Sequence, residues 1–395
     1  MARVLVTYGW VRSSYAVVRS LGRHGATVFV GDPARLAMAK HSRYCAGAVR
    51  LPDFFADPEA YVAAVAEACR AHAIDWLMPG HEDLYWLALY RDRLPSAVRL
   101  VHPPVASMAL AMDKGAALEQ ARQAGCPVPA TGHAHSLEGL ERLARTTAYP
   151  AVLKTRAGNS AKGVAVCRDA DELMARARQW ITQYGLGPDE YPVVQEHLPG
   201  RAIGTCHLFR EGEPVAASAE VYLRAKGGGV FGTSTLRQTV SAPEAVAAGE
   251  RVLRALDWHG VAQMDFMADA DGTDRLIEIN PRLWGSLPLS ITAGVDFPRW
   301  VEMLALAEGA IPAVQAPAGV TQRWLLGEGL AALHYLRRGR PRAALRALNP
   351  VAATAYDDLC RDDPVPFLFE LLDYARRFAA SGNANPAVPG MLRRR

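Results

Sequence analysis

The first hundred residues alternate short apolar runs with segments of helical spacing, and this alternation constrains the fold more than any other feature. The apolar runs lie at 3–7, 27–30, 75–79 and 98–101. A chain that alternates in this way folds as a parallel sheet with helices on both faces. The first turn lacks Gly-x-Gly-x-x-Gly, so we do not expect a dinucleotide site, although Asp32 closes the second run.

From residue 113 the pattern becomes that of an α+β domain. A helix is expected from Lys114, and two short strands are expected around a Gly-rich hairpin within 149–168. Further strands are expected at 193–196 and near 204–221, 237–240, 261–268 and 275–279, with helices at 171–182 and 244–256. Pro312 and Pro317 mark a boundary. The sequence therefore predicts an α/β domain at 1–112, an α+β domain at 113–310 and a mostly helical extension at 311–395.

Charge and cysteine content exclude several classes of protein. The formal net charge is +4, and the basic excess lies in residues 311–395, so a nucleic-acid partner is not expected. No segment approaches the roughly 20 apolar residues that span a bilayer, so no stable membrane insertion is expected. The six cysteines form no Cys-x-x-Cys pair, which argues against a disulfide framework or a zinc site. We expect a cytoplasmic protein.

Lysine is rare in this chain. Of the 44 basic residues only five are lysine, namely Lys40, Lys114, Lys154, Lys162 and Lys226. A compact ammonium and a planar guanidinium differ most at phosphate-binding and buried sites. The lysines are therefore the first candidates for binding an anion. The alternative is that their positions in the sequence reflect chance.

The residues near 278 have the pattern of a magnesium site. In a strand over 275–279 the side chains alternate, so Glu278 and Asn280 are expected on one face together with Leu276. Carboxylate and amide oxygens suit Mg²⁺, and Asp265 on a neighbouring strand can add a second carboxylate. Arg282 follows where a phosphate or carboxylate would lie. The alternative is a surface hairpin with ordinary polar residues.

These residues carry a family resemblance. Gly260-Val261-x-x-x-Asp265-Phe266 followed by Glu278-Ile279-Asn280-Pro281-Arg282 resembles the metal-binding core of ATP-grasp ligases, the family of carbamoyl-phosphate synthase, biotin carboxylase and D-alanine–D-alanine ligase. The resemblance covers roughly residues 1–310. It implies a pre-ATP-grasp domain followed by a two-lobed ATP-grasp fold. The small lid lobe would lie at about 125–195 and the metal-binding lobe at about 196–310.

The resemblance also implies roles for individual residues. Two Mg²⁺ ions, with Mn²⁺ as an alternative, would be bound by Asp265, Glu278 and Asn280, while Arg282 and Lys154 would be catalytic. The segment 201–204 lacks the acid that the family usually places near the ribose. The resemblance places ATP contacts at the start of the helix from residue 114, at the end of the strand near 154, in the Gly-rich hairpin and in the segment 195–198, which would join the two lobes and contact adenine. The expected residues are Lys114, Lys154, Ser160, Lys162, Gly163, Gln195, Glu196 and Leu198.

The implied reaction is ATP-dependent activation of a carboxylate as an acyl phosphate, which an amine attacks to give an amide or peptide bond, ADP and phosphate. The expected partners are small-molecule carboxylate and amine substrates, and the sequence leaves a homodimer open. Candidates for substrate contacts are Arg224, Lys226, His81 and Glu82, with a solvated loop and a helix cap as the alternative interpretations. The turn at 8–12, which follows the first strand, is a further candidate, with an ordinary surface turn as the alternative.

Two other functions remain open at the level of sequence. The first is an ATP-grasp carboxylase or kinase, which the identity of the product distinguishes from a ligase. The second is a non-catalytic nucleotide-binding regulatory protein, to which the basic extension and the apolar segment 367–372 point. Phe367, Leu368, Leu371 and Leu372 have the spacing of a helix face, however, and we expect them to pack on the body of the protein.

Overall fold

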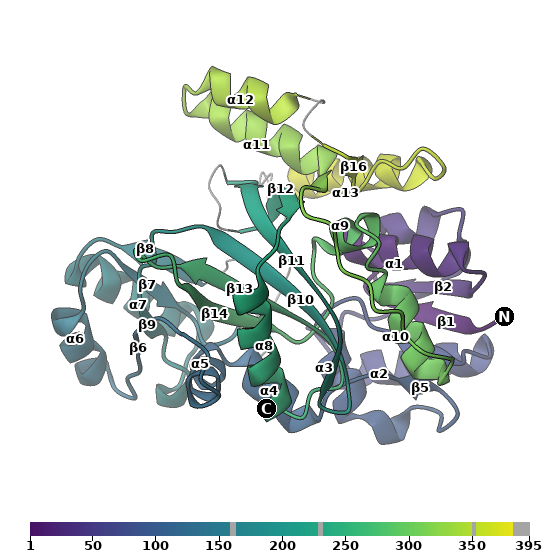
Figure 1. Ribbon diagram of the computed structural model, residues 1–395, viewed down its shortest axis with the longest axis horizontal. Helices are drawn as coiled ribbons and strands as arrows, with labels where there is room; N and C mark the ends of the chain where they lie inside the picture. Colours follow the sequence, from purple (N-terminus) through teal and green to yellow (C-terminus); the bar gives the residue numbers. More distant parts are fainter. Residues whose placement is uncertain (159–162, 228–231, 350–352, 382–395) are drawn as a thin grey trace.

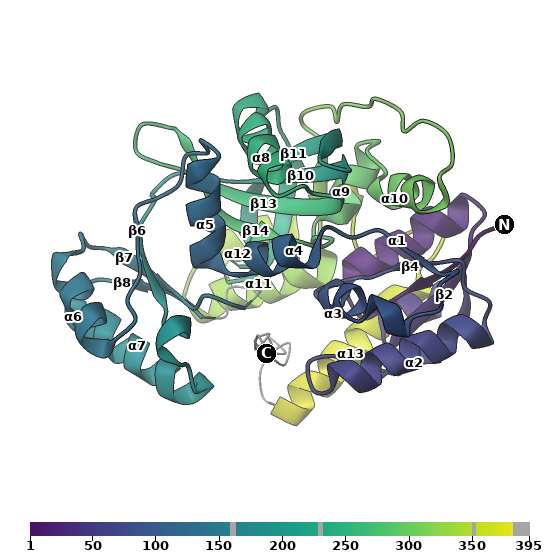
Figure 2. The same cartoon turned by 90° about the horizontal axis from the view of Figure 1, so that it is seen from below.

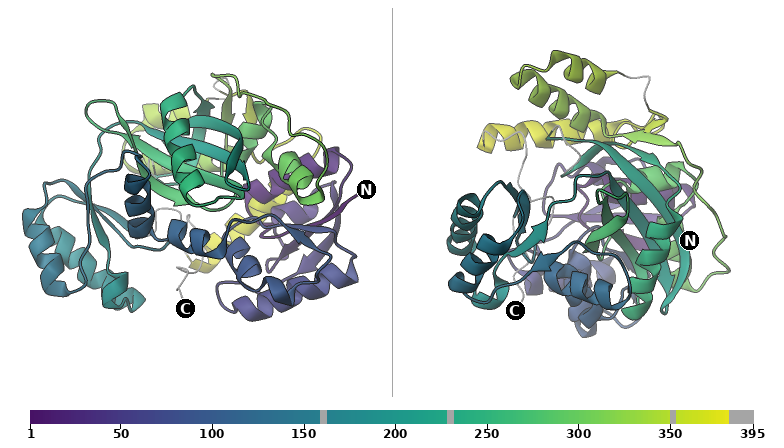
Figure 3. Two further views of the ribbon diagram at one scale, coloured as in Figure 1. Left: turned by 60° about the horizontal axis from the view of Figure 1, so that its bottom comes forward. Right: turned by 60° about the vertical axis from the view of Figure 1, so that its left-hand side comes forward.

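Three β-sheets organise the part of the chain that the structure describes. The computed structural model describes residues 1–158, 163–227, 232–349 and 353–381. A five-stranded sheet lies at one end, a four-stranded lobe at the other and a seven-stranded sheet between them (Figures 1 and 3). This arrangement confirms the predicted α/β and α+β fold class, whereas the exact domain boundaries stay a prediction.

The five-stranded sheet is parallel throughout, in the order β3-β2-β1-β4-β5. Its strand β3 was not among the predicted strands, because its small residues form no apolar run. The chain leaves β1 toward β2 on one side and returns to β4 on the other, so the loops after β1 and β4 flank a topological switch point. The elements are β1 (Arg3–Val6), β2 (Thr27–Asp32), β3 (Cys45–Arg50), β4 (Trp76–Met78), β5 (Arg99–Leu100), α1 (Arg12–Arg23), α2 (Pro58–Ala71), α3 (Asp83–Leu89), η1 (Met38–His41) and η2 (Arg91–Arg93).

The four-stranded lobe is antiparallel, in the order β6-β9-β7-β8, as the predicted hairpin requires. Two helices pack on it through a core that includes Leu140, Leu153 and Leu173. The elements are β6 (Thr131–Gly132), β7 (Ala151–Lys154), β8 (Val164–Cys167), β9 (Val193–Glu196), α6 (Leu137–Thr146), α7 (Ala170–Tyr184) and η3 (Pro188–Glu190).

The seven-stranded central sheet has the order β14-β13-β10-β11-β12-β15-β16. Its last two strands come from residues beyond 310, so the predicted helical extension also completes a sheet. Helices α4, α5 and α8 share a buried apolar core with the sheet. The elements are β10 (Ala202–Arg210), β11 (Glu213–Ala225), β12 (Ser234–Thr239), β13 (Gly260–Ala268), β14 (Asp274–Asn280), β15 (Thr321–Arg323), β16 (Ala355–Tyr356), α4 (Val105–Met112), α5 (Lys114–Gln123) and α8 (Pro243–Ala255).

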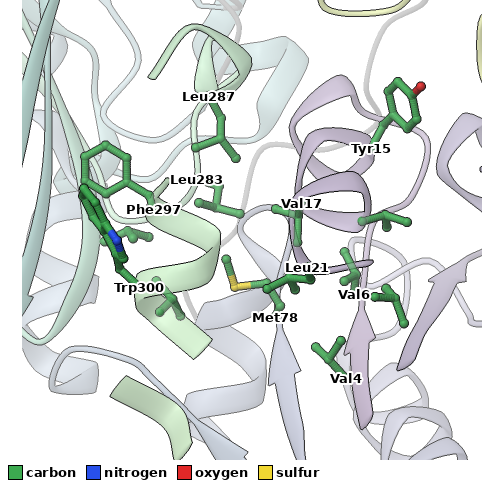
Figure 4. Close-up of a cluster of buried hydrophobic side chains, with 14 of the residues drawn as sticks. Val4, Val6, Tyr15, Val17, Leu21, Met78, Leu283, Leu287, Phe297 and Trp300 are labelled. Carbon is green, nitrogen blue, oxygen red and sulfur yellow. The ribbon is translucent and has the colours of Figure 1, made fainter. Parts of the chain in front are cut away.

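Helices α9 (Leu287–Thr292) and α10 (Phe297–Leu306) join the central sheet to the five-stranded sheet. Figure 4 shows Phe297, Trp300 and Leu287 facing Val17 and Met78 in one buried cluster. Burying large apolar side chains from both sides stabilises the junction by about 1.5–3 kcal/mol for each side chain. The two sheets are therefore held in a fixed relation.

The last helices are α11 (Leu325–Arg337), α12 (Pro341–Leu348) and α13 (Val365–Ser381). The prediction that the apolar face of α13 packs on the body is wrong, since the side chain of Leu368 is 54% exposed and Leu371 and Leu372 are exposed as well. The helix instead turns Glu370 and Asp373 inward. It contacts η1, which follows β2 in the chain, and it lies at the same end of the molecule as the five-stranded sheet (Figure 2). No helix in the described part of the chain has both the length and the apolar character needed to cross a membrane.

Buried ion pairs attach the last segment to the rest of the molecule. Asp357, which is fully buried, pairs with Arg237 of β12, and its Oδ2 lies 3.2 Å from Nε of Arg12 in α1. Glu328 of α11 pairs in the same way with Arg224 and with Arg323, whose Nη2 lies 2.8 Å from Glu328 Oε2. Each of these two carboxylates thus forms ion pairs with two guanidinium groups that come from different parts of the chain.

Candidate functional site

A cavity of about 700 Å³ lies where the four-stranded lobe, the central sheet, the five-stranded sheet and the last helices meet. Lys154 and Gln195 line it from the lobe, and Asp265 and Glu278 line it from the central sheet. Its far end is lined by residues that follow β1 and by residues of the last segment. Most of the sequence-predicted site residues therefore border a single space.

Two acidic side chains face this cavity from adjacent strands. Asp265 of β13 and Glu278 of β14 are register partners, and two positions along the ladder Gln263 pairs with Asn280. A β-bulge follows Asp265, because the next residue of β13 pairs with Leu276 and leaves Ile277 as the extra residue. The predicted alternation was wrong at this point: Leu276 is fully buried in the core, whereas Ile277 lines the cavity beside Glu278 and Asn280.

Hydrogen bonds fix the orientation of Asp265 and Asn280. Asp265 Oδ1 accepts from Tyr222 Oη at 2.7 Å and from Gln263 Nε2 at 2.8 Å. The Asn280 amide donates to Gln263 Oε1 at 3.0 Å, and Asn280 Oδ1 accepts from Arg282 Nη2 at 3.0 Å. Tyr222 and Gln263 were not predicted from sequence. Gln263 had a usable signal, because it lies two residues before Asp265 on the same strand face.

The absence of a side chain at Gly204 makes room for this network. A Cβ at Gly204 would overlap the hydroxyl of Tyr222, which donates to Asp265. Gly204→Ala should therefore displace Tyr222 and destabilise the protein by about 1–3 kcal/mol. Urea unfolding of the variant and of the unmodified protein measures the change. Gly227→Ala is the control, because a Cβ there meets no atom within 4 Å, and it should leave stability unchanged. Equal stability of the Gly204 variant and the unmodified protein would contradict the expectation.

Two lysines shape the electrostatics of the acidic pair. Lys114 Nζ lies 3.0 Å from Glu278 Oε1 and donates to the carbonyl of Gly158 at 2.8 Å. Burial opposes ionisation of Glu278, but Lys114 and Lys154 together hold its pKa below the usual value. Burial, and then the negative charge of Glu278, raise the pKa of Asp265 to about 6. Burial lowers the pKa of Lys154 to about 8.

The donor set fits a hard divalent cation. Asp265 and Glu278 repel each other, and a cation between them would relieve that repulsion. Oxygen donors of two carboxylates and one amide are those that Mg²⁺ prefers. In residues 1–158, 163–227, 232–349 and 353–381, no three His, Cys, Asp or Glu side chains gather as a metal cluster. A cation here would therefore take its remaining ligands from Asn280, from water or from a bound anion.

The part of the cavity next to the lobe is apolar. Leu198, which is 4% exposed, lines it together with Val152, Met267 and Ile277. Gln195 also lines it and donates to Thr131 Oγ1 at 3.2 Å, while Glu196 Oε2 accepts from the amide of Ala130 at 3.2 Å. A flat apolar ring system fits such walls.

The Gly-rich hairpin is partly described. Gly163 has a φ of 68°, and a Cβ there would overlap Thr155, so only glycine fits. Ser160 and Lys162 lie outside the described residues.

The candidate substrate residues divide into two groups. His81 and Lys226 line the far end of the cavity. Glu82 Oε1 lies 3.8 Å from Arg282 Nε, so Glu82 forms an ion pair with the arginine that lines the cavity. Arg224 pairs with Glu328 instead, which is a structural contact. The turn at 8–12 was a further candidate for substrate contact, and its residues Trp10 and Arg12 line the far end.

Sequence relatives share about half of the chain. Residues 190–326 match a family model described as "ATP-grasp in the biosynthetic pathway with Ter operon". A D-alanine–D-alanine ligase from Acidiphilium cryptum is 30% identical over 219 residues, which are 50% of this chain and 67% of the relative. The 2-oxoglutarate carboxylase small subunit of Hydrogenobacter thermophilus is 24% identical over 218 residues. That match spans 50% of this chain but only 43% of the carboxylase subunit.

Solved structures share the fold over a larger part of the chain. The biotin carboxylase domain of the Hydrogenobacter thermophilus 2-oxoglutarate carboxylase, solved with MgADP and bicarbonate, superposes with a TM-score of 0.65 at 16% identity. It covers 80% of this chain and 73% of its own. An L-amino acid ligase from Bacillus licheniformis superposes with a TM-score of 0.63 at 20% identity and covers 81% of this chain and 79% of its own. By its fold and by its ligase relative, this chain belongs to the ATP-grasp family of ligases and carboxylases.

Proposed function

We propose that this chain is a Mg-ATP-dependent ligase that activates a carboxylate as an acyl phosphate and joins it to an amine. The observation that carries the proposal is the acidic pair Asp265 and Glu278, which lines one cavity together with the apolar residues Val152 and Leu198 and the cations Lys154 and Arg282. An apolar wall suits adenine, and cations suit an anionic group. The reacting phosphate would then lie beside the acidic pair.

The residues present fit the Mg²⁺ that the family uses. In our proposal Asp265, Glu278 and Asn280 hold it, and Tyr222 and Gln263 keep Asp265 and Asn280 in place. When bound, Mg²⁺ neutralises charge on the phosphates that would otherwise oppose attack by a carboxylate.

Three cationic side chains complete the electrostatics. Lys154 and Arg282 line the cavity, and Lys114 contacts Glu278. We assign Lys154 and Lys114 to the ATP phosphates and Arg282 to the phosphoryl group being transferred. Fixed cations of this kind stabilise charge that builds up in the transition state. The four-stranded lobe, about residues 125–195, would cover the acyl phosphate and keep water away.

A carboxylase is the second candidate, because one sequence relative and one structural relative are carboxylases. The ligase is favoured because the relative that is covered over two thirds of its length joins two amino acids, as its printed name states. The carboxylase would require bicarbonate as the activated carboxylate. The nature of the product therefore separates the two.

The test is ADP formation by the purified full chain with ATP and Mg²⁺, with products identified by mass spectrometry. Amino acids and small carboxylic acids would be supplied in pools, and bicarbonate would be supplied separately. Under our proposal ADP forms when both a carboxylate and an amine are present, and the product mass is their sum less one water. ADP that forms with bicarbonate and yields a carboxylated product would replace the ligase by the carboxylase. ATP binding without ADP in any pool would overturn both.

Lys154→Met should weaken binding of a non-hydrolysable Mg-ATP analogue by roughly 10- to 100-fold, because a charge-assisted hydrogen bond contributes about 1.5–3 kcal/mol. Isothermal titration calorimetry measures the change directly. Lys40→Met is the matched control, since Lys40 donates to the backbone carbonyls of Asp32 and Ala34 outside the cavity lining. Equal affinity of the Lys154 variant and the unmodified protein would contradict the phosphate assignment.

A further inference from the structure

Helices α11 and α12 form a hairpin whose interior consists mostly of small side chains. Figure 1 shows the two helices side by side at the outer edge of the molecule. A helix that packs on a neighbour normally buries its leucines and leaves small or polar residues at the surface. This hairpin does the opposite, so its outer faces need a separate explanation. The residues buried between the helices are Ala331, Ala332, Tyr335, Ala344 and Ala347.

Four leucines of the hairpin lie on its outer faces. On α12, Leu345 is 70% exposed and Leu348 is 56% exposed, and on α11 both Leu333 and Leu336 are exposed as well. The two leucines of each helix are three residues apart, so they lie next to each other on one face of that helix. Contact of these faces with water is unfavourable, and a second surface that covered them would stabilise the assembly.

Five exposed arginines accompany the leucines. On α11, Arg337 lies four residues after Leu333, and on α12, Arg342 lies three residues before Leu345, so a cation and a leucine share a face of each helix. Each outer face is therefore both apolar and cationic. The five are Arg337, Arg338, Arg340, Arg342 and Arg346.

The positive charge of the hairpin has no acidic counterpart. Residues 329–356 contain no Asp or Glu. The acids that flank this stretch, Glu328 and Asp357, are buried and pair with arginines of α1, β11, β12 and β15. None of the five hairpin arginines forms an ion pair with an acid in the described part of the chain, and the remaining residues include no Asp or Glu. Their charge is therefore available to an anionic surface.

Helix α13 also exposes leucines, but its arginines are paired. Arg377 Nε lies 2.6 Å from an oxygen of Asp373, and Arg376 Nη2 lies 3.8 Å from the other oxygen of the same carboxylate. The combination of exposed leucines with unpaired positive charge therefore distinguishes the α11–α12 hairpin from α13.

We propose that the α11–α12 hairpin is a docking surface for a lipid bilayer that carries anionic headgroups. The arginines bind the phosphate groups, and the leucines enter the apolar boundary beneath them. A second copy of this chain is the less favourable occupant, because a symmetric contact would bring two sets of five arginines together. The docking surface is independent of the proposed ligase activity.

The experiment is co-sedimentation of the full chain with vesicles of phosphatidylcholine and phosphatidylglycerol in a ratio of about 7:3, compared with vesicles of phosphatidylcholine alone. We expect at least about 10-fold tighter binding to the mixed vesicles, because only these attract the arginines. Raising NaCl from about 50 mM to about 500 mM should release the protein, since salt screens the attraction. Equal binding to both kinds of vesicle, or binding to neither, would overturn the proposal.

Two double variants separate the apolar contact from the charge. Leu345→Gln with Leu348→Gln keeps every arginine and should weaken binding to the mixed vesicles by at least about 10-fold, because two leucines no longer leave water. Arg342→Gln with Arg346→Gln keeps every leucine and should weaken binding by about 10- to 30-fold, since each arginine near an anionic surface contributes about fivefold. Unchanged affinity of either variant would reject the docking surface.

Leu368→Gln with Leu372→Gln in α13 is the matched control. It replaces two leucines that are 54% and 45% exposed and leaves the hairpin intact, so binding should be retained. A loss equal to that of the hairpin variants would show that the hairpin is not the docking surface. Thermal unfolding should show the same midpoint for every variant, because all the replaced side chains are exposed.

Sedimentation velocity without lipid tests the alternative occupant. We expect the unmodified protein and the Leu345 and Leu348 double variant to have the same oligomeric state. If the unmodified protein self-associates and the double variant does not, the hairpin is an interface between copies of this chain, and the lipid proposal is overturned.

Discussion

Replacing Glu278 with Gln should reduce ATP turnover by about 100- to 1000-fold or more, the range expected when an electrostatic contact at the reacting centre is lost. The substitution preserves shape but removes the charge that pairs with Lys114 at 3.0 Å and that would hold Mg²⁺ beside Asp265. It also relieves the repulsion between two buried carboxylates, so the fold should be retained. Turnover would be measured as ADP release, and the fold by circular dichroism and thermal unfolding.

Glu213→Gln is the matched control for this variant. Glu213 lies on β11 of the same sheet, its side chain is 76% exposed, and its nearest basic partner is Arg254 at 3.5 Å. The same chemical change there should leave turnover within about twofold, since exposed pairs contribute little. Normal turnover in the Glu278 variant would remove the metal assignment altogether.

Replacing Asp357 with Asn should destabilise the folded protein by about 3–5 kcal/mol, the usual result of removing one partner from a buried ion pair. The variant leaves Arg237, fully buried, and Arg12, 9% exposed, without their shared carboxylate. Because these arginines come from β12 and α1, the loss weakens the attachment of the last segment to two parts of the molecule at once. Urea unfolding followed by tryptophan fluorescence would show a lower midpoint.

Asp189→Asn serves as the control for this measurement, because the Asp189 side chain is 95% exposed and its partner is a histidine at 3.2 Å. Its unfolding midpoint should match that of the unmodified protein. An Asp357 variant with an unchanged midpoint would show that the buried pair contributes no stability, as happens when the desolvation cost equals the attraction.

Most of the fold followed from local patterns in the sequence. The strand predicted at 193–196 coincides with β9, and the hairpin predicted within 149–168 is β7 and β8, because apolar runs bounded by glycine leave few alternatives. The strand β3 escaped prediction, since Ala46, Gly47 and Ala48 form no apolar run and are ordered by pairing with β2. Pairing partners of that kind are not visible in a single segment.

In the candidate site, too, local sequence patterns predicted some features and missed others. Glu278 and Asp265 were placed on adjacent strands from spacing alone, and they are register partners. The side of the sheet that Leu276 occupies could not be derived, because the β-bulge at Ile277 shifts the alternation by one residue. Arg12 and Tyr374 reach the cavity from positions more than 350 residues apart, and no local pattern relates such positions.

The placement of β15 and β16 has a consequence for the order of events during synthesis. A chain emerging from the ribosome completes β10 to β14 first, yet β12 pairs with β15 through Leu236, Arg237 and Gln238 only after residue 323 has appeared. Until then β12 presents an unpaired edge, and edges of this kind recruit other strands. Asp357, the partner of Arg237, emerges later still. The nascent sheet therefore depends on protection of this edge until the residues of β15 have been made.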